Sequence, residues 1–365
     1  MRRAGSYDKI FFFLSIFLTL FGLFILASAS IGFSMSKFGS PYYYFLHQVL
    51  YGVLPGLALL WATYKIPYEK WKKFALPLLL LAIFLMSLVL IPGIGLLHGG
   101  ARRWLAFGGV SFQPAEFLKL AYIIYLAAWI ESKSKSISSF KFGLLPFAIM
   151  SAFIASFLVM QPDIGTLMVL MISVLALFFI SGGSFRQIAL LSAVGLVIIS
   201  VLVAVEPYRR ERLKVFLDRQ SDLQGSGYQI NQALIAVGSG GLFGRGLGLS
   251  RQKFSYLPEP IGDSIFAVFA EELGFLGAIS FLGAFLLFFL RGMWMASRAP
   301  DIFGSMLCAG ILFLIMFQVL INISAIIGLM PLTGIPLPFV SYGGSALALT
   351  LAEVGIILNI SRRKK

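Results

Sequence analysis

Charge and cysteine are both scarce in this chain of 365 residues. Charged residues make up 12% of the sequence and hydrophobic residues 59%, whereas a soluble domain averages about 25% charged residues. The single cysteine, Cys308, excludes an intrachain disulfide and a multi-cysteine metal site. His47 and His98 are too few and too isolated for a histidine-based metal site. The lack of charge along the whole chain favours one membrane domain, residues 1–365, over a soluble core.

Long apolar runs are abundant instead. A helix needs about 20 apolar residues to cross a bilayer, and ten runs approach that length. We therefore predict an all-α polytopic membrane protein, a bundle of about ten transmembrane helices. The runs are Ile10–Ser30, Tyr43–Tyr64, Phe74–Ile91, Gln113–Ile130, Gly143–Met160, Ile164–Ile180, Gln187–Val205, Ser264–Leu290, Ile302–Leu329 and Gly344–Ile360.

The formal net charge of +14 would suggest a nucleic-acid partner if the protein were soluble. Here the basic residues form short clusters between apolar runs, mainly on the side that would hold both termini. This is the distribution that the positive-inside rule produces. We therefore expect both termini in the cytoplasm and no nucleic-acid partner.

One long segment, residues 206–263, lacks a clear spanning run and is predicted to be a large extracytoplasmic loop between the seventh and eighth helices. Within it, Gln229–Val237 is apolar but too short to span, so an interfacial or re-entrant helix is expected. A glycine-rich run follows from Gly238 to Gly248. Long loops in compact folds are usually functional or disordered, and this one has too many aromatic and aliphatic residues for disorder.

Several charged residues lie at the predicted outer ends of helices. Glu116 and Lys119 are three residues apart and share a helix face, so a bracing ion pair and a substrate-binding role are equally good interpretations. Asp163 lies at an outer turn. Asp263 begins the eighth helix near the interface, where water and a polar substrate can reach it. A helix N-terminus also favours aspartate as a cap, and that interpretation of Asp263 is the alternative.

Glu271 and Glu272 lie about two turns further along the same predicted helix. Intramembrane carboxylates are functional candidates by default. For this pair we favour structural hydrogen bonds over catalysis.

Seven co-linear motifs make the chain resemble the RodA/FtsW/SpoVE family, also called SEDS proteins. The motifs are Gly100–Trp104, Gln113–Glu116 with Lys119, Gln161–Thr166, Gly225–Gln229, Ser239–Gly248, Leu257–Pro260 with Asp263–Phe266 and Glu271–Gly274, and Leu337–Ser345. The stretch Ser250–Pro260 is more similar to the FtsW and SpoVE branch than to RodA.

The resemblance implies a peptidoglycan glycosyltransferase, an inverting hexosyltransferase that acts in cell division or elongation. Such enzymes polymerise lipid II, a disaccharide-pentapeptide on undecaprenyl pyrophosphate, at the outer face of the bacterial cytoplasmic membrane. Asp263 aligns with the family's essential aspartate, although the preceding Ile261-Gly262 departs from the family's usual residues. The implied partners are lipid II, a class B penicillin-binding protein, and divisome or elongasome proteins.

This chemistry needs a base for the acceptor hydroxyl, which we assign to Asp263, and cations for the pyrophosphate leaving group. A divalent cation, Mg²⁺ or Mn²⁺, could share the second task, with ligands that the sequence leaves unknown. The glycine run 238–248 could present N–H groups to phosphate or simply form tight turns. The candidate substrate-binding residues are Arg102, Arg103, Trp104, Glu116, Lys119, Asp163, Arg209, Arg210, Arg212 and Ser341.

Two other functions stay open at this point. A bundle with buried charges could be a lipid II flippase, but the halves show no convincing inverted repeat, and a transporter would place its site near the midplane. A non-catalytic scaffold for division proteins is the third function. It predicts that Asp163 or Asp263 tolerates substitution in cells.

Overall fold

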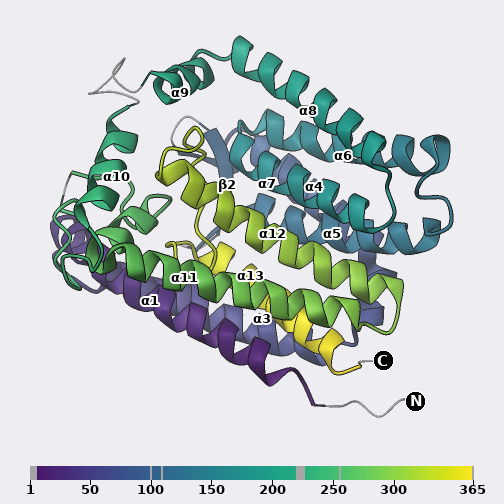
Figure 1. Ribbon diagram of the computed structural model, residues 1–365, viewed down its shortest axis with the longest axis horizontal. Coiled ribbons are helices and arrows are strands. Elements are labelled where there is room, and N and C mark those ends of the chain that lie inside the picture. Colours follow the sequence, from purple (N-terminus) through teal and green to yellow (C-terminus); the bar gives the residue numbers. More distant parts are fainter. Residues whose placement is uncertain (1–5, 99–100, 108–109, 219–226, 255, 364–365) are drawn as a thin grey trace.

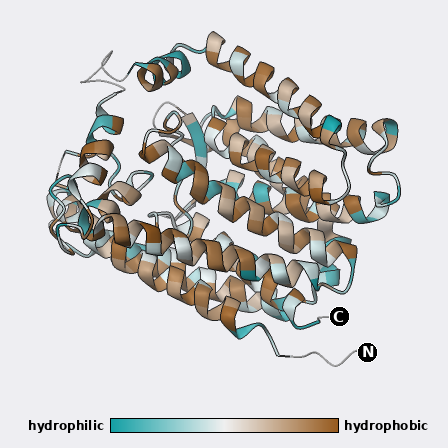
Figure 2. Cartoon of the chain, viewed as in Figure 1, coloured by the Kyte–Doolittle hydropathy of each residue, from teal (hydrophilic) through white to brown (hydrophobic). Residues whose placement is uncertain are grey.

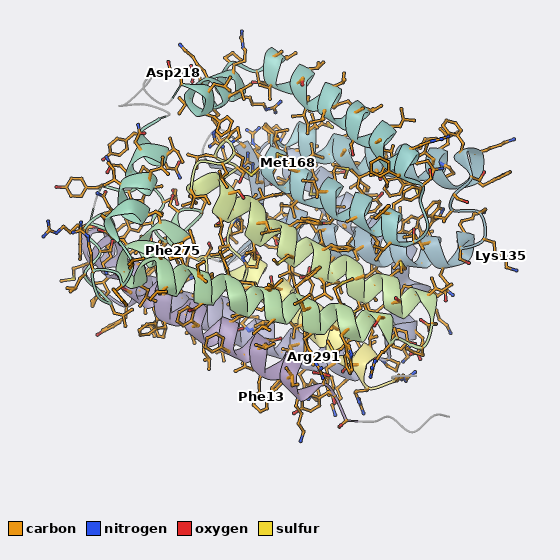
Figure 3. The ribbon with its side chains drawn as sticks, viewed as in Figure 1. Phe13, Lys135, Met168, Asp218, Phe275 and Arg291 are labelled. Atoms are coloured by element: carbon orange, nitrogen blue, oxygen red, sulfur yellow. The ribbon has the colours of Figure 1, made fainter. Side chains whose placement is uncertain are left out.

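The computed structural model describes residues 6–98, 101–107, 110–218, 227–254 and 256–363. Long helices lie side by side (Figure 1). Figure 3 places Asp218 and Phe275 at one end of the molecule and Lys135 at the other. The C-terminal end of the chain lies at the Lys135 end (Figure 1). Gly100, Gly225 and Ser226, which belong to two of the seven motifs, fall outside the described residues.

Each predicted apolar run coincides with a helical segment. Because a bilayer offers no hydrogen-bond partners, a spanning backbone must satisfy its own polar groups, and the helix does so within one segment. The segments are α1 (Lys9–Phe38), α2 (Tyr43–Gln48) continuing through the π-helical turn η1 (Val49–Val53) into α3 (Leu54–Lys65), α4 (Tyr68–Leu90), α5 (Pro114–Lys133), η2 (Phe140–Leu144) with α6 (Leu145–Met160), α7 (Ile164–Ile180), α8 (Phe185–Val205), α11 (Ile265–Ser297), α12 (Ile302–Ile326) and α13 (Gly344–Ser361).

Eight helices in the described part of the chain are long and apolar enough to cross a membrane. Of the remaining two predicted spans, α7 is a shorter apolar helix, and α5 carries charges at both ends. The polytopic helical membrane fold is therefore confirmed. The count of ten spans stays a prediction.

The long helices are mostly apolar (Figure 2), and many of their large hydrophobic side chains are exposed. On α8, for example, Leu196 and Val197 are exposed, and Gln187 is the buried residue of that helix. In contrast, α12 and α13 are buried along most of their length. An apolar exterior is costly in water but suits lipid, so α12 and α13 form the centre of a membrane-embedded bundle.

Acidic side chains begin two described helices, α1 and α12, at the predicted cytoplasmic edge. Asp8 accepts a hydrogen bond from the Phe11 N–H at 3.0 Å, and Asp301 accepts one from the Gly304 N–H at 2.7 Å. Both carboxylates satisfy N–H groups that lack intrahelical partners. These two residues therefore have a structural role.

A small antiparallel sheet follows α4, which the sequence did not predict. Its strands are β1 (Gly95–His98), β2 (Ala101–Phe107) and β3 (Val110–Phe112), in the order β1-β2-β3. Gly95 pairs with Leu105 in the first ladder, and Leu105 pairs with Phe112 in the second. Leu105 is fully buried. Because the strands are short and mix charged with apolar residues, they lack the alternation that would identify them in the sequence.

The long segment 206–263 contains two helices. Pro207 begins α9 (Pro207–Leu217), at the position where proline needs no N–H partner. The second helix, α10 (Tyr228–Ser239), contains the apolar stretch for which a helix was predicted. Both lie at the same end of the molecule as Asp218 (Figures 1 and 3).

The predicted continuous helix Ser264–Leu290 is wrong in one respect, because α11 breaks at Gly274. Gly274 has φ 68° and ψ −168°, a conformation open to glycine. A Cβ there would lie 2.2 Å from the Gly244 nitrogen. The glycine-rich loop enters the break, and Phe275 and Leu276 donate N–H bonds to its carbonyls at 2.9 and 3.1 Å. Glu271 and Glu272 therefore lie on a separate short helix rather than along one straight axis.

Candidate active site

Asp263 lies in the loop before α11, and its side chain is half-buried. The Gln229 amide donates to Oδ1 at 3.1 Å and is 3.3 Å from Oδ2. The Ser264 hydroxyl donates to Oδ1 at 3.3 Å. The N-cap residue of α11 is Ser264 rather than Asp263. Capping therefore does not explain the aspartate at this position.

The backbone around Asp263 is held by residues distant in the sequence. Asn322 on α12 donates to the Asp263 carbonyl at 2.9 Å and to the Ile335 carbonyl at 2.8 Å. The Ser341 hydroxyl donates to the Gly262 carbonyl at 2.7 Å, and it accepts the Leu337 N–H at 2.8 Å. The geometry thus brings Ser341 to the predicted site as a support for the Asp263 loop.

The surroundings of Asp263 raise its pKa to about 6. Burial is the main cause, since it penalises the charged carboxylate, and the negative charge of Glu259 adds to it. The Gln229 hydrogen bond, the positive charge of Arg212 and the Ser264 hydrogen bond act in the opposite direction. A carboxyl group with a pKa close to neutral is well matched to a general-base role.

Arg212 is the candidate substrate-binding arginine whose positive charge lowers the pKa of Asp263. Its guanidinium donates to the Leu332 carbonyl at 2.7 Å and lines a small pocket between α9, α10 and the segment after α12. Arg209 instead donates to the Leu202 carbonyl of α8 at 3.1 Å. Arg210 is exposed. Of these three residues, Arg212 is therefore the one positioned to meet a substrate beside Asp263.

The predicted residues of the first outer loop lie on β2. Arg103 donates to the carbonyls of Gln161 at 3.3 Å and Pro162 at 2.5 Å, which ties the sheet to the turn between α6 and α7. Arg102 and Trp104 are partly exposed. Arg102 is thus the better candidate of the two arginines for contact with a ligand.

Asp163 is the N-cap of α7. Its carboxylate is buried and accepts the Thr166 N–H at 3.2 Å and the Thr166 hydroxyl at 2.9 Å. These bonds account for the aspartate structurally. The geometry therefore favours a supporting role over the substrate contact that the sequence suggested.

Glu116 and Lys119 form an ion pair of 2.9 Å with both side chains buried. The Lys119 ammonium also donates to Gln318 at 2.6 Å, and the Gln318 amide donates to the Pro336 carbonyl at 2.9 Å. The pair therefore connects α5 to α12 and to the segment that supports Asp263. Of the two interpretations open from the sequence, this geometry favours the brace.

Three supporting residues were missed by the sequence reasoning. Gln318 and Asn322 are four residues apart on the apolar helix α12 and face the same segment. Such a polar pair inside a spanning helix is a usable signal, because unpaired polar groups are costly in lipid. Gln229 belongs to a recognised motif, but its link to Asp263 depends on tertiary contact.

Glu271 and Glu272 hold the loop that precedes Asp263. Glu271 accepts the Ser250 hydroxyl at 2.5 Å and the Arg251 N–H at 3.1 Å. Glu272 pairs with Lys253 at 2.7 Å, and both are buried. These contacts are structural hydrogen bonds, the role that we favoured for both carboxylates.

The glycine run uses its N–H groups within the protein. Arg245 and Gly246 donate to the carbonyls of Glu271 and Glu272 at 3.0 and 3.1 Å. These two N–H groups are therefore engaged in the break of α11 rather than directed at a phosphate.

Among the described residues there is no group of three or more His, Cys, Asp or Glu side chains that could hold a metal ion. Mg²⁺ is often held by one or two carboxylates together with substrate phosphates.

The chain matches the family model of FtsW, RodA and SpoVE, described as a cell cycle protein, over residues 8–365. It is 42% identical over 361 residues to the stage V sporulation protein E of Bacillus subtilis, covering 99% of this chain and 98% of that protein. It is 37% identical to a probable peptidoglycan glycosyltransferase FtsW of Geobacter sp. strain M18, covering 100% of this chain and 99% of that protein.

Solved structures show the same fold. One is a peptidoglycan synthase complex, described as coordinating polymerization and crosslinking, with 28% identity and a TM-score of 0.81. The match covers 98% of both chains. Another is the rod shape determining protein RodA of Thermus thermophilus, with 26% identity and a TM-score of 0.70, covering 98% of this chain and 97% of that one.

Proposed function

The chain belongs to the family of FtsW, RodA and SpoVE proteins, and from this premise we propose that it polymerises lipid II with Asp263 as the general base. It is a peptidoglycan glycosyltransferase of the membrane, as its named relatives are. The observation that carries the assignment of Asp263 is its environment: a half-buried carboxylate, supported by Gln229 and Asn322, whose pKa is raised to about 6.

In the proposed step, Asp263 accepts the proton of the acceptor sugar hydroxyl. The acceptor oxygen forms a bond to the anomeric carbon of the donor. The bond from that carbon to the pyrophosphate oxygen breaks, and the electron pair leaves with undecaprenyl pyrophosphate. The energy for the transfer resides in the pyrophosphate, so the step needs no nucleotide.

Arg212 is our candidate for stabilising the leaving pyrophosphate. Its side chain lines a small pocket with residues of α9, α10 and the segment after α12, and its positive charge acts on the Asp263 carboxylate. A guanidinium offers paired donors that suit phosphate oxygens. Arg102 is a second candidate, since it is partly exposed, whereas Lys119 is engaged with Glu116 and Gln318.

The proposed setting is the outer face of a bacterial cytoplasmic membrane, in division or elongation. We propose a class B penicillin-binding protein as partner, because a solved structure with this fold belongs to a complex for polymerization and crosslinking. Divisome or elongasome proteins are further proposed partners. The alternative, a lipid II flippase, is not favoured, because the named relatives are glycosyltransferases.

The test is polymerisation of lipid II by the purified chain with a class B penicillin-binding protein, without nucleotide. A general base contributes about 10²–10⁴ in rate, so we expect Asp263→Asn to lose at least about 100-fold while its melting temperature stays close to wild type. Glu211→Gln, an exposed carboxylate on α9, is the matched control and should polymerise normally.

Polymer from Asp263→Asn at the wild-type rate would remove Asp263 from the mechanism. Absence of polymer from the wild type, together with lipid II translocation in liposomes, would replace the polymerase with the flippase.

A further inference from the structure

Glu259 has an unusual backbone conformation for its residue type. It lies between Pro258 and Pro260 in the loop before Asp263, and its φ is 49°. Left-handed backbone favours glycine, and sometimes asparagine or aspartate, over a longer side chain. The backbone conformation at this position therefore does not explain why the residue is a glutamate.

The Glu259 carbonyl organises the turn that carries Asp263. It accepts the Gly262 N–H at 3.0 Å and the Ser264 N–H at 3.3 Å. These two donors flank Asp263, so the backbone of Glu259 determines where the aspartate lies.

The Glu259 side chain folds back over the same turn. A Cβ added to Gly262 would lie 3.1 Å from Glu259 Oε2, which places the carboxylate against the peptide next to Asp263. Gly262, which lacks a side chain, leaves room for it. The Glu259 side chain is also exposed to solvent.

The groups around Asp263 come from four elements. Glu259 raises its pKa from within the same loop, while Arg212 on α9 and Gln229 on α10 lower it, together with the adjacent Ser264. From α12, Asn322 contacts only the backbone carbonyl of Asp263. The negative charge of Glu259 therefore offsets the effect of the Arg212 charge on the pKa of Asp263.

We propose that Glu259 is a positioning residue for glycosyl transfer: its carboxylate keeps Asp263 a strong enough base, and its carbonyl fixes the turn that presents Asp263. This inference rests on the proposed function, since it assumes that Asp263 removes the acceptor proton. Glu259 exchanges no proton or bond with the substrate. It acts through Asp263.

The experiment is the rate of lipid II polymerisation by the complex with the penicillin-binding protein, measured from pH 5 to pH 8. Glu259→Gln removes the charge and keeps the size. We expect its rate at pH 8 to fall by up to about threefold, because a base weaker by about half a pKa unit transfers the proton less well. We also expect the ratio of the rate at pH 5 to that at pH 8 to rise about two- to threefold, as for a base whose pKa falls by about half a pH unit.

Two further variants separate the effect of the Glu259 charge from the effect of its backbone conformation. Glu259→Gly removes the carboxylate but suits the left-handed backbone, so it should keep the melting temperature of the wild type and still show the altered pH ratio. Glu259→Asp retains a carboxylate and should restore part of the wild-type ratio. Glu211→Gln again serves as the control and should leave the pH profile unchanged.

A uniform loss of rate at every pH in Glu259→Gln and Glu259→Gly would overturn the electrostatic role and leave Glu259 a structural residue. A wild-type rate and profile in both variants would overturn the proposal entirely. The wild-type protein and Asp263→Asn distinguish failure of this proposal from failure of the proposed function. If the wild type makes polymer and Asp263→Asn does not, the proposed function holds whatever the Glu259 variants do. If the wild type makes no polymer, the proposed function and the role of Glu259 are both overturned.

Discussion

Asp263 differs from the other carboxylates near it in what it contacts. Asp163 caps a helix, Glu116 pairs with Lys119, and Glu272 pairs with Lys253. Asp263 instead receives hydrogen bonds from the side chains of Gln229 and Ser264 and remains half-buried. A carboxylate that is neither a cap nor part of an ion pair with a described residue is the one best placed for proton transfer.

The pH dependence of the wild type follows from this environment. The base must be deprotonated to act, and the pKa of Asp263 is raised to about 6. The rate should therefore be low below pH 6, rise through that region and level off above about pH 7. Initial rates of polymerisation across the pH range would check this. A rate that stays constant down to pH 4.5 would contradict it.

Asn322 provides a test of how strictly Asp263 must be positioned. Asn322→Ala removes donors to the Asp263 and Ile335 carbonyls. A buried acceptor left unsatisfied costs about 1–3 kcal/mol, so the melting temperature should drop, and we expect the rate to fall about tenfold. Ser280→Ala, whose exposed hydroxyl donates to the Leu276 carbonyl in its own helix, should change neither quantity. Wild-type activity in Asn322→Ala would show that the loop holds its shape without this support.

The break in α11 gives one element two roles. The short part before Gly274 carries Glu271 and Glu272, which fasten the preceding loop. The helix as a whole, Ile265–Ser297, is one of the candidate spans. Because the loop donates and accepts the hydrogen bonds that the helix loses at Gly274, the interruption is tolerated at this place.

Gly274→Ala should therefore be strongly destabilising. The added methyl group would meet the Gly244 backbone in a conformation that alanine avoids, and we expect a loss of at least about 2 kcal/mol. Gly283→Ala is the matched control, since a Cβ there meets nothing within 4 Å, and it should be neutral or slightly stabilising. Thermal unfolding in detergent is the measurement. Equal melting temperatures would mean that the loop and the helix can separate without cost.

The molecule as a whole has two chemically different ends. The candidate active site, α9 and α10 lie at one end, and Lys135 lies at the other with the C-terminal end of α13 (Figures 1 and 3). The proposed polymerisation of lipid II at the outer face of the membrane requires the first end to face outward. The arrangement of basic residues in the sequence predicts the same orientation.

Cysteine labelling tests this orientation. Cys308, the natural cysteine, is fully buried, so it should not react with a membrane-impermeant maleimide. Ser111→Cys on β3 should react in intact cells, whereas Ser134→Cys, after α5, should react only once the membrane is permeabilised. Both positions are exposed in the structure. The reverse labelling pattern would invert the proposed topology.

The amino-acid sequence was sufficient for the fold class and for the family. Apolar runs of spanning length leave the backbone few options other than a helix in lipid, so the helices could be located from composition alone. Asp263 could be singled out because its motif is local and lies at the start of a helix. The three-stranded sheet and the break at Gly274 were not foreseen, since neither has a periodic pattern.

The construction of the site depended on the tertiary structure. Gln229, Asn322 and Ser341 reach the Asp263 loop across 34, 59 and 79 residues of sequence. Hydrogen bonds between such distant segments have no signature in local composition. The ion pairs of Lys119 and Lys253 show the same difference between local and tertiary contacts. Glu116, the partner of Lys119, lies one helical turn away in the sequence. Glu272, the partner of Lys253, is brought close by the loop that enters the break in α11. Burial and neighbouring charge, which set the basicity of Asp263, exist only once these segments have packed together.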